Sequence, residues 1–226
     1  MKFYKHFDTF VFDYDGTLFD SLHHIIHVFS IIGQHAQKLG LIDQAWSSTF
    51  ISSIIGLNPK EVWKKLLPHA SDEVRFELSA LYSKSMFEHL SSIQSQWYPH
   101  AYEVIDQLLN EHKMCILLTN ARRYYVDIAI EQHPILRRFS HVVCAQDFNY
   151  QSKSDIIKQL PLQGKVLVIG DKIDDALAAQ SINAQSLWAS YGYGQDVTDG
   201  VHFTSKLDSI YDLTQISSHR EEVMPL

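Results

Sequence analysis

Two carboxylates, Asp13 and Asp15, lie two residues apart directly after the apolar run Thr9–Phe12. The run has the length and composition of a buried strand of a parallel sheet. Because residues i and i+2 of a strand point the same way, we expect both side chains to enter one small space before Gly16 turns the chain. Like charges repel at that distance, so either a divalent cation between them or a proton on one of them is expected. The alternative is a strand that ends in an ordinary Asp-Gly turn.

Polar residues that could act on the same ligand follow the next three apolar runs of the chain. Thr119 and Asn120 follow the run 114–118. Lys153 lies beyond the run 142–145, and an acidic stretch at 170–175 follows the run 165–169. Open α/β sheets bind their ligands at the carboxyl ends of the strands. A carboxylate pair, a hydroxyl, a lysine and a second acidic group are suited to phosphoryl transfer on a metal ion, where positioning and charge neutralisation do most of the work.

The elements that must position these residues alternate between helix and buried strand. Helical patterns cover 101–112, 124–132, 154–160 and 175–180, and apolar runs typical of strands cover 114–118, 142–145, 165–169 and 185–189. This alternation predicts an α/β fold with a doubly wound parallel sheet. The strand before Asp13 belongs to the same sheet.

The segment between the first and second strands is predicted to be a helical insertion. Apolar residues recur at spacings of three and four between Leu22 and Leu39, and Ser71 is a helix N-cap followed by acidic residues. Residues 20–96 contain helix signals and no clear strand pattern. We therefore predict a discontinuous Rossmann-like core, residues 1–19 and 97–226, and a helical domain of residues 20–96.

Composition limits the class of protein. The chain of 226 residues is 46% hydrophobic, as in globular proteins, and has a formal net charge of −7 without a basic run. A nucleic-acid partner is therefore not expected. Cys115 and Cys144 lie in apolar runs and are expected to be buried, reduced thiols. The N-terminus has no signal-peptide pattern and no apolar run approaches the ~20 residues that span a bilayer, so we predict a cytoplasmic protein without a membrane partner.

The order and spacing of the polar residues resemble the four motifs of the haloacid dehalogenase-like (HAD) hydrolase superfamily, in particular its phosphoglycolate phosphatase-like members with a helical cap. The first motif, Asp-x-Asp-Gly-Thr-Leu, is matched at 13–18. Thr119 matches the second motif and Lys153 the third. The fourth, Gly-Asp-x-x-x-Asp before a helix with paired alanines, is matched at 170–179, where its acids are Asp171 and Asp175. Each motif alone is weak, but four in this order on the strand ends are specific.

The resemblance implies a catalytic role for each matched residue in the core. Asp13 would be the nucleophile that forms an aspartyl-phosphate, and Asp15 would be the acid and base of the two half-reactions. Thr119, Asn120 and Lys153 would bind the phosphoryl group, and Lys153 would also neutralise charge on Asp13. The helical domain would be the cap.

The resemblance also implies a magnesium ion. Its protein ligands would be Asp13, the main-chain carbonyl of Asp15, and Asp171. Asp175, one helical turn after Asp171, would support Lys153 or the metal-bound waters without ligating the ion. The sequence leaves open whether Asp174 or Asp175 is the second acid of the fourth motif.

Each of these residues also has a purely structural explanation. Thr119 could be a strand-end hydroxyl that bonds its own backbone, and Lys153 could be a solvated loop residue. Asp174 and Asp175 could be favourable charges at a helix N-terminus. Only the combination with the carboxylate pair at 13 and 15 favours a site.

The implied function is a magnesium-dependent phosphatase acting on a small phosphorylated metabolite, such as phosphoglycolate, a sugar phosphate or a nucleotide. A phosphomutase of the β-phosphoglucomutase kind would have the same core residues. A dehalogenase is disfavoured by Asp15, and a phosphorylated receiver-like signalling module is disfavoured by the Asp-x-Asp spacing and the helical insertion. The sequence indicates neither the substrate, nor the cap residues that would contact it, nor the oligomeric state.

Overall fold

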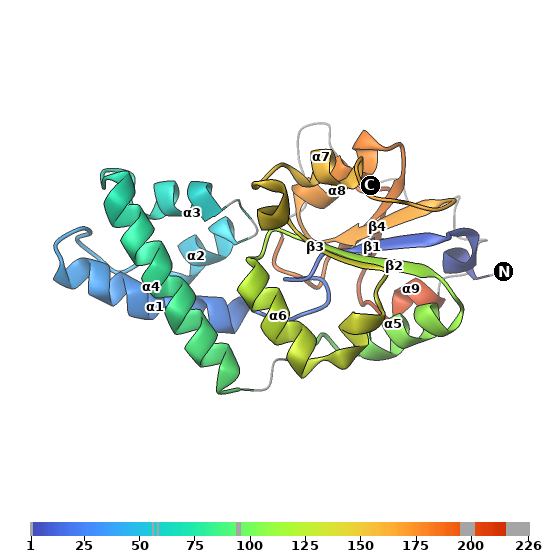
Figure 1. Ribbon diagram of the computed structural model, residues 1–226, viewed down its shortest axis with the longest axis horizontal. Coiled ribbons are helices and arrows are strands. Elements are labelled where there is room, and N and C mark those ends of the chain that lie inside the picture. Colours follow the sequence, from blue (N-terminus) through green and yellow to red (C-terminus); the bar gives the residue numbers. More distant parts are fainter. Residues whose placement is uncertain (1, 56, 58, 94–95, 195–201, 216–226) are drawn as a thin grey trace. The chain divides into compact units, whose positions relative to one another are not determined.

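Figure 1 shows the computed structural model of the protein, which describes residues 2–55, 57, 59–93, 96–194 and 202–215. The chain divides into two compact units. The core unit comprises Met1–Asp20 and Gln96–Leu226, and the helical unit comprises Ser21–Ser95. Among the described residues, no helix is both long and apolar enough to cross a membrane.

The core unit is built on a six-stranded sheet with the order β3-β2-β1-β4-β5-β6, in which every neighbouring pair is parallel. The strands are β1 (Thr9–Phe12), β2 (Met114–Thr119), β3 (His141–Cys144), β4 (Val166–Gly170), β5 (Gln185–Ala189) and β6 (Ser205–Leu207). The predicted α/β fold with a doubly wound parallel sheet is therefore confirmed.

Helices cover both faces of this sheet (Figure 1). On one face lie α5 (Ala101–Asn110), α6 (Arg123–Gln132) and α9 (Asp212–Gln215), and on the other lie α7 (Lys153–Ile157) and α8 (Ile173–Ser181). Short 3₁₀ helices, η1 (Phe3–His6), η2 (Pro134–Arg138) and η3 (Ala145–Phe148), join these elements. The predicted helix at 101–112 ends earlier, at Asn110, and the helix predicted at 154–160 ends at Ile157.

The central strand β1 is buried on both faces, which explains its continuous apolar sequence. Phe10 and Phe12 are fully buried on one side, and the ring of Phe12 meets that of Phe139 edge-on. Val11 points to the opposite side, into a cluster with residues of β2, β4, α7 and α8. Because β1 is packed on both faces, the position of the residues that follow it is fixed by the core.

The sheet has a topological switch point between β1 and β4. From β1 the chain first adds β2 and β3 on one side, and then β4, β5 and β6 on the other. The connections therefore leave in opposite directions at the carboxyl ends of β1 and β4, where open α/β sheets bind ligands.

The helical unit consists of α1 (Leu22–Lys38), α2 (Ser48–Ile54), α3 (Pro59–Leu66) and α4 (Asp72–Ser91). Its described residues form no strand. An aromatic group fills its centre, where the rings of Phe29 and Tyr82 stack at 4.3 Å and Trp46 and Trp63 pack around them. The Ser71 hydroxyl accepts the N–H of Val74 at 3.4 Å and so caps α4 where the sequence predicted its start.

Candidate active site

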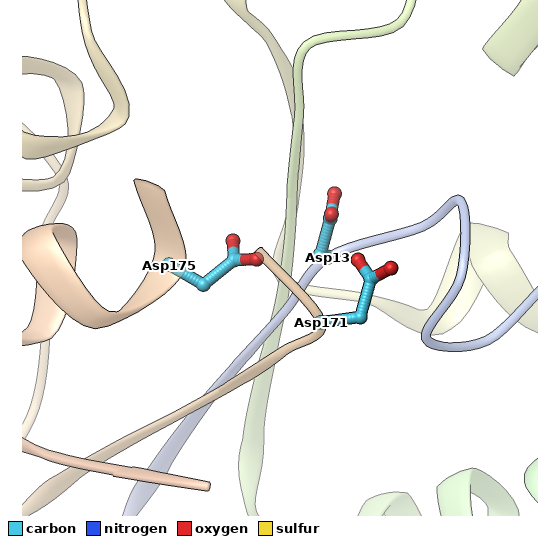
Figure 2. A group of neighbouring side chains, drawn as sticks. All are labelled: Asp13, Asp171 and Asp175. Carbon is cyan, nitrogen blue, oxygen red and sulfur yellow. The ribbon is translucent and has the colours of Figure 1, made fainter. Parts of the chain in front are cut away.

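Three buried carboxylates gather at the switch point of the sheet. Asp13 and Asp171 follow the last residues of the adjacent strands β1 and β4, and Asp175 lies in the first turn of α8. Figure 2 shows the three side chains, and one oxygen atom of each lies within 4.8 Å of the others. The Asp13 N–H donates to the carbonyl of Ile169 at 2.9 Å, which extends the strand pairing by one residue and fixes the Asp13 backbone.

A buried lysine pairs with two of these carboxylates. The Lys153 ammonium lies 2.8 Å from Asp13 Oδ1 and 2.7 Å from Asp175 Oδ1, and its side chain is only 3% exposed. Burial alone lowers the pKa of Lys153, but the two carboxylates outweigh it and raise the pKa above its usual value. The lysine is therefore a permanent buried cation.

The local sequence explains why Lys153 is in place. It is the first residue of α7, and the hydroxyl of Ser152 before it accepts the N–H of Asp155 at 3.1 Å. This N-cap starts a helix on the face of the sheet that carries Val11 and sets the direction of the lysine. The solvated-loop alternative for Lys153 is excluded by its burial.

Asp171 has one carboxylate oxygen held by the backbone and the other unpaired. Oδ2 accepts the N–H groups of Tyr193 and Gly194, at 3.2 and 2.8 Å. Oδ1 is buried without a hydrogen-bond partner among the described residues. Burial, and then the charge of Asp13, raise the pKa of Asp171 to about 7.

An unpaired buried carboxylate oxygen next to a second carboxylate fits a cation site. The ligands that Asp13 and Asp171 offer are oxygen atoms, which suit a hard divalent cation such as Mg²⁺ better than a softer metal. The side chain of Asp175 is less available, because Oδ1 binds Lys153 and Oδ2 accepts the N–H of Lys172 at 3.1 Å. The acids at 13 and 171 are thus the better candidates for ligands.

Two glycines allow the loops to close around Asp171. Gly16 has a φ angle of +81°, which L-residues rarely adopt, and a Cβ atom there would collide with the Asp171 carboxylate. A Cβ atom on Gly194 would collide with the Asp171 main chain. The first of these glycines belongs to the Asp-x-Asp-Gly motif, so the site needs that residue for steric reasons.

The carboxylate of Asp15 has a hydrogen-bond partner that the sequence did not indicate. β1 ends at Phe12, and Asp15 is not among the three acids whose oxygen atoms lie within 4.8 Å of one another. Instead, Asp15 Oδ1 accepts the hydroxyl of Tyr125, on α6, at 2.8 Å. Sequence reasoning missed Tyr125. Its place in the first turn of the helix that follows β2 was the one available signal, since that turn faces the same edge of the sheet.

The second motif lies at the carboxyl end of β2. Thr119 is 1% exposed, and its Oγ1 accepts the N–H of Ala121 at 3.1 Å. This is the backbone contact of the structural alternative, but it leaves the hydroxyl proton for another acceptor. Asn120 donates its amide to Asp174 Oδ2 at 3.4 Å.

The structure also distinguishes the two candidate acids of the fourth motif by their burial and partners. Asp175 is 2% exposed and binds the Lys153 ammonium, whereas Asp174 is partly exposed and bonds Asn120. Asp175 therefore provides the second acid at the carboxylate group, and it also closes a capping box at the start of α8 through the Lys172 N–H.

The sequence profile of the haloacid dehalogenase-like hydrolases matches residues 10–189, most of the chain. The chain belongs to this family. The predicted resemblance is confirmed, including its phosphoglycolate phosphatase-like character, and the protein is an enzyme of the hydrolase class. Membership of a hydrolase family also argues against the receiver-like signalling module.

Individual relatives point the same way. A phosphoglycolate phosphatase of Vibrio cholerae is 25% identical over 202 residues, which cover 84% of this chain and 87% of the relative. The structure of a predicted phosphoglycolate phosphatase from Haemophilus somnus superposes with a TM-score of 0.71 at 20% identity, over 93% of this chain and 97% of that one. CbbY from Rhodobacter sphaeroides, solved in complex with xylulose-(1,5)bisphosphate, superposes with a TM-score of 0.75 at 14% identity, over 90% and 95% of the two chains.

The raised pKa of Asp171 predicts a pH-dependent stability of the metal-free protein. Because the folded pKa is about 7 and the ordinary value is near 4, the folded state holds this proton more tightly than the unfolded state. The resulting stabilisation is complete below about pH 4 and is lost as the pH rises through about 7. Between these two pH values, the unfolding free energy of the wild type should fall as Asp171 ionises. The side chain of Asp171→Asn cannot ionise, so the unfolding free energy of this variant should fall by about 2–4 kcal/mol less.

This prediction is checked by urea denaturation of both proteins in a chelator across the pH range. The exposed Asp43 of the helical unit provides a control, and Asp43→Asn should follow the wild-type curve. Parallel curves for the wild type and Asp171→Asn would contradict the assignment of this titration to Asp171.

Proposed function

We propose that the protein is a magnesium-dependent phosphatase that hydrolyses a small phosphomonoester through an aspartyl-phosphate on Asp13. The observation that carries the proposal is the buried Lys153 ammonium, which bridges Asp13 and Asp175 beside the unpaired Oδ1 of Asp171. This arrangement places a nucleophile beside a built-in positive charge, and a cation bound at Asp171 would add a second positive charge for a phosphoryl group. The family and the phosphoglycolate phosphatases among the relatives support the same reaction class.

Asp13 is oriented for attack on phosphorus. Its Oδ1 accepts the Tyr14 N–H at 2.8 Å and the Lys153 ammonium at 2.8 Å. Both bonds are to the same oxygen, so Oδ2 is the atom proposed to form the bond to phosphorus while the ester oxygen leaves. The ammonium also reduces the repulsion between the carboxylate and an incoming phosphate dianion.

Asp15 is proposed to deliver a proton to the leaving oxygen and then to take one from the hydrolytic water. The Tyr125 hydroxyl donates to its Oδ1 at 2.8 Å and would orient the carboxyl group for these transfers.

The remaining residues are proposed to bind and neutralise the phosphoryl group. Lys153 is the built-in cation, and Thr119 and Asn120 would donate to phosphoryl oxygens. Mg²⁺ would be held by Asp13, Asp171 and the main-chain carbonyl of Asp15, and when bound it supplies the charge neutralisation that phosphoryl transfer needs. Asp175 would act by holding Lys153.

The two units are proposed to divide the work. The core unit would carry the chemistry, as residues 1–19 and 97–226 of the predicted catalytic domain, and the helical unit would be the cap that governs access and substrate choice. Location in the cytoplasm stays a prediction of the sequence.

The role of Asp13 predicts that Asp13→Asn removes activity without unfolding the protein. An amide is a poor nucleophile, so hydrolysis of a generic aryl phosphate in Mg²⁺ should fall by at least roughly a thousandfold. Far-UV circular dichroism would report the fold, and Asp127→Asn, at an exposed acid of α6, is the matched control that should keep wild-type activity. Near-native turnover by Asp13→Asn would rule out the covalent mechanism.

The relatives predict phosphoglycolate as the preferred substrate. In a panel of phosphoglycolate, sugar phosphates and nucleoside monophosphates, we expect the highest kcat/KM for phosphoglycolate, with product analysis showing free phosphate. A transferred phosphoryl group on a second sugar hydroxyl would instead indicate a phosphomutase. If no compound is hydrolysed although calorimetry shows that Mg²⁺ binds, the phosphatase proposal fails.

The contact between Tyr125 and Asp15 predicts a specific kinetic effect of Tyr125→Phe. A hydrogen bond to a charged group contributes about 1.5–3 kcal/mol, so kcat should fall roughly tenfold or more while KM changes little. The Tyr125 hydrogen bond favours the ionised form of Asp15, so the variant should hold the Asp15 proton to higher pH. The alkaline limb of the pH–rate profile should therefore move to higher pH. Tyr102→Phe, at an exposed tyrosine of α5, is the control. An unchanged pH profile would mean that Tyr125 does not position the proton donor.

A further inference from the structure

The helical unit contains a group of four histidines, a residue type that often binds metals. His23, His24 and His27 lie on α1, and His89 lies on the adjacent helix α4. His24 Nδ1 and His89 Nε2 are 3.0 Å apart. The ring centroid of His27 is 4.8 Å from that of His89, and the ring centroid of His23 is 3.7 Å from that of His24. Four imidazoles from two helices thus meet in one place.

The environment favours the neutral form of His24 and His89. His24 is only 6% exposed and His89 is partly buried. Burial, and then the neighbouring histidines, lower the pKa of His24 to about 4, and the same causes lower the pKa of His89 below its usual value. Neutral imidazole is the form that binds metals.

We propose that His24, His27 and His89 form a binding site for a divalent transition metal, with Zn²⁺ as the best fit, and that His23 or a water completes it. Two nitrogen ligands of a tetrahedral zinc ion, each at 2.0–2.1 Å from the metal, lie roughly 3.3 Å apart. The pair formed by His24 Nδ1 and His89 Nε2 needs to open by only a few tenths of an ångström to accept the ion. The proton now shared by the pair would move to the outer nitrogen of its own ring.

The third ligand follows from helix geometry. His24 and His27 are three residues apart on α1, so they lie on neighbouring positions of one helix face. His27 is exposed, and its side chain is therefore able to turn its ring toward the pair by a change of rotamer. His23, which is also exposed, lies four residues before His27, a spacing at which two histidines of a helix bind one zinc ion.

This site differs chemically from the acidic one in the core unit. Imidazole nitrogens suit Zn²⁺, Cu²⁺ and Ni²⁺, whereas carboxylate oxygens suit Mg²⁺. The bound metal would link α1 to α4 and stabilise the helical unit. The proposal does not depend on the phosphatase function.

The test uses the full-length protein in excess Mg²⁺, titrated with Zn²⁺ by calorimetry. We expect one zinc ion per chain with a Kd on the order of micromolar or tighter, and a Tm that rises with zinc concentration, as binding to the folded state requires. With Cu²⁺ in place of Zn²⁺, the electron paramagnetic resonance spectrum should show hyperfine coupling to imidazole nitrogens.

The variants His89→Gln and His27→Gln should each weaken zinc binding at least tenfold. His35→Gln, at an exposed histidine of the same helix α1, should bind as the wild type does. Since His27 is exposed, its variant tests the proposal even if His89→Gln fails to fold. Wild-type affinity in His27→Gln, or no zinc binding by the wild type, would overturn the proposal.

Discussion

The site depends on one buried cation, the Lys153 ammonium, held between the carboxylates of Asp13 and Asp175. None of these three groups would be stable at this depth alone, since removal of one partner from a buried ion pair typically costs about 3–5 kcal/mol. Together with Asp171 they place three carboxyl groups around one ammonium. This group of acids is the place where the proposed cation, and through it the proposed phosphate, would bind. The same ion pairs that stabilise the buried Lys153 therefore also fix the carboxylate of the proposed nucleophile, Asp13.

The parallel sheet is what brings these charges together. Asp13 and Asp171 are far apart in the chain, but β1 and β4 pair in register and place both acids at one edge. Helices α7 and α8 lie on one face of the sheet and supply Lys153 and Asp175 from their first turns. The loop at Tyr193 and Gly194 supplies backbone N–H groups to the same acid. Each contact comes from a different connection, so the site exists only in the assembled sheet.

Local patterns predicted the strong elements well and the weak ones poorly. β1, β5 and the start of α1 lie where their apolar spacing placed them. β6, of three residues, and α2, of seven, were not predicted. The first is too short to show a period, and the second is rich in serine, which competes with the helix for backbone hydrogen bonds. Tyr125 is the instructive omission, since its contact with Asp15 joins α6 to the turn after β1 and no local pattern reports it.

The sequence by itself determined the fold class and the family and predicted the reactive residues, because apolar periodicity and motif order are properties of the chain. Only the tertiary structure decided which hydrogen-bond and ion-pair partners these residues have. It joined Asp15 to Tyr125, 110 residues away, chose Asp175 over Asp174 to hold Lys153, and left Asp171 Oδ1 unpaired. It also brought His89 of α4 to His24 of α1. Hydrogen bonds and ion pairs act over a few ångströms in space, and residue spacing along a chain does not report which distant side chains packing will bring that close.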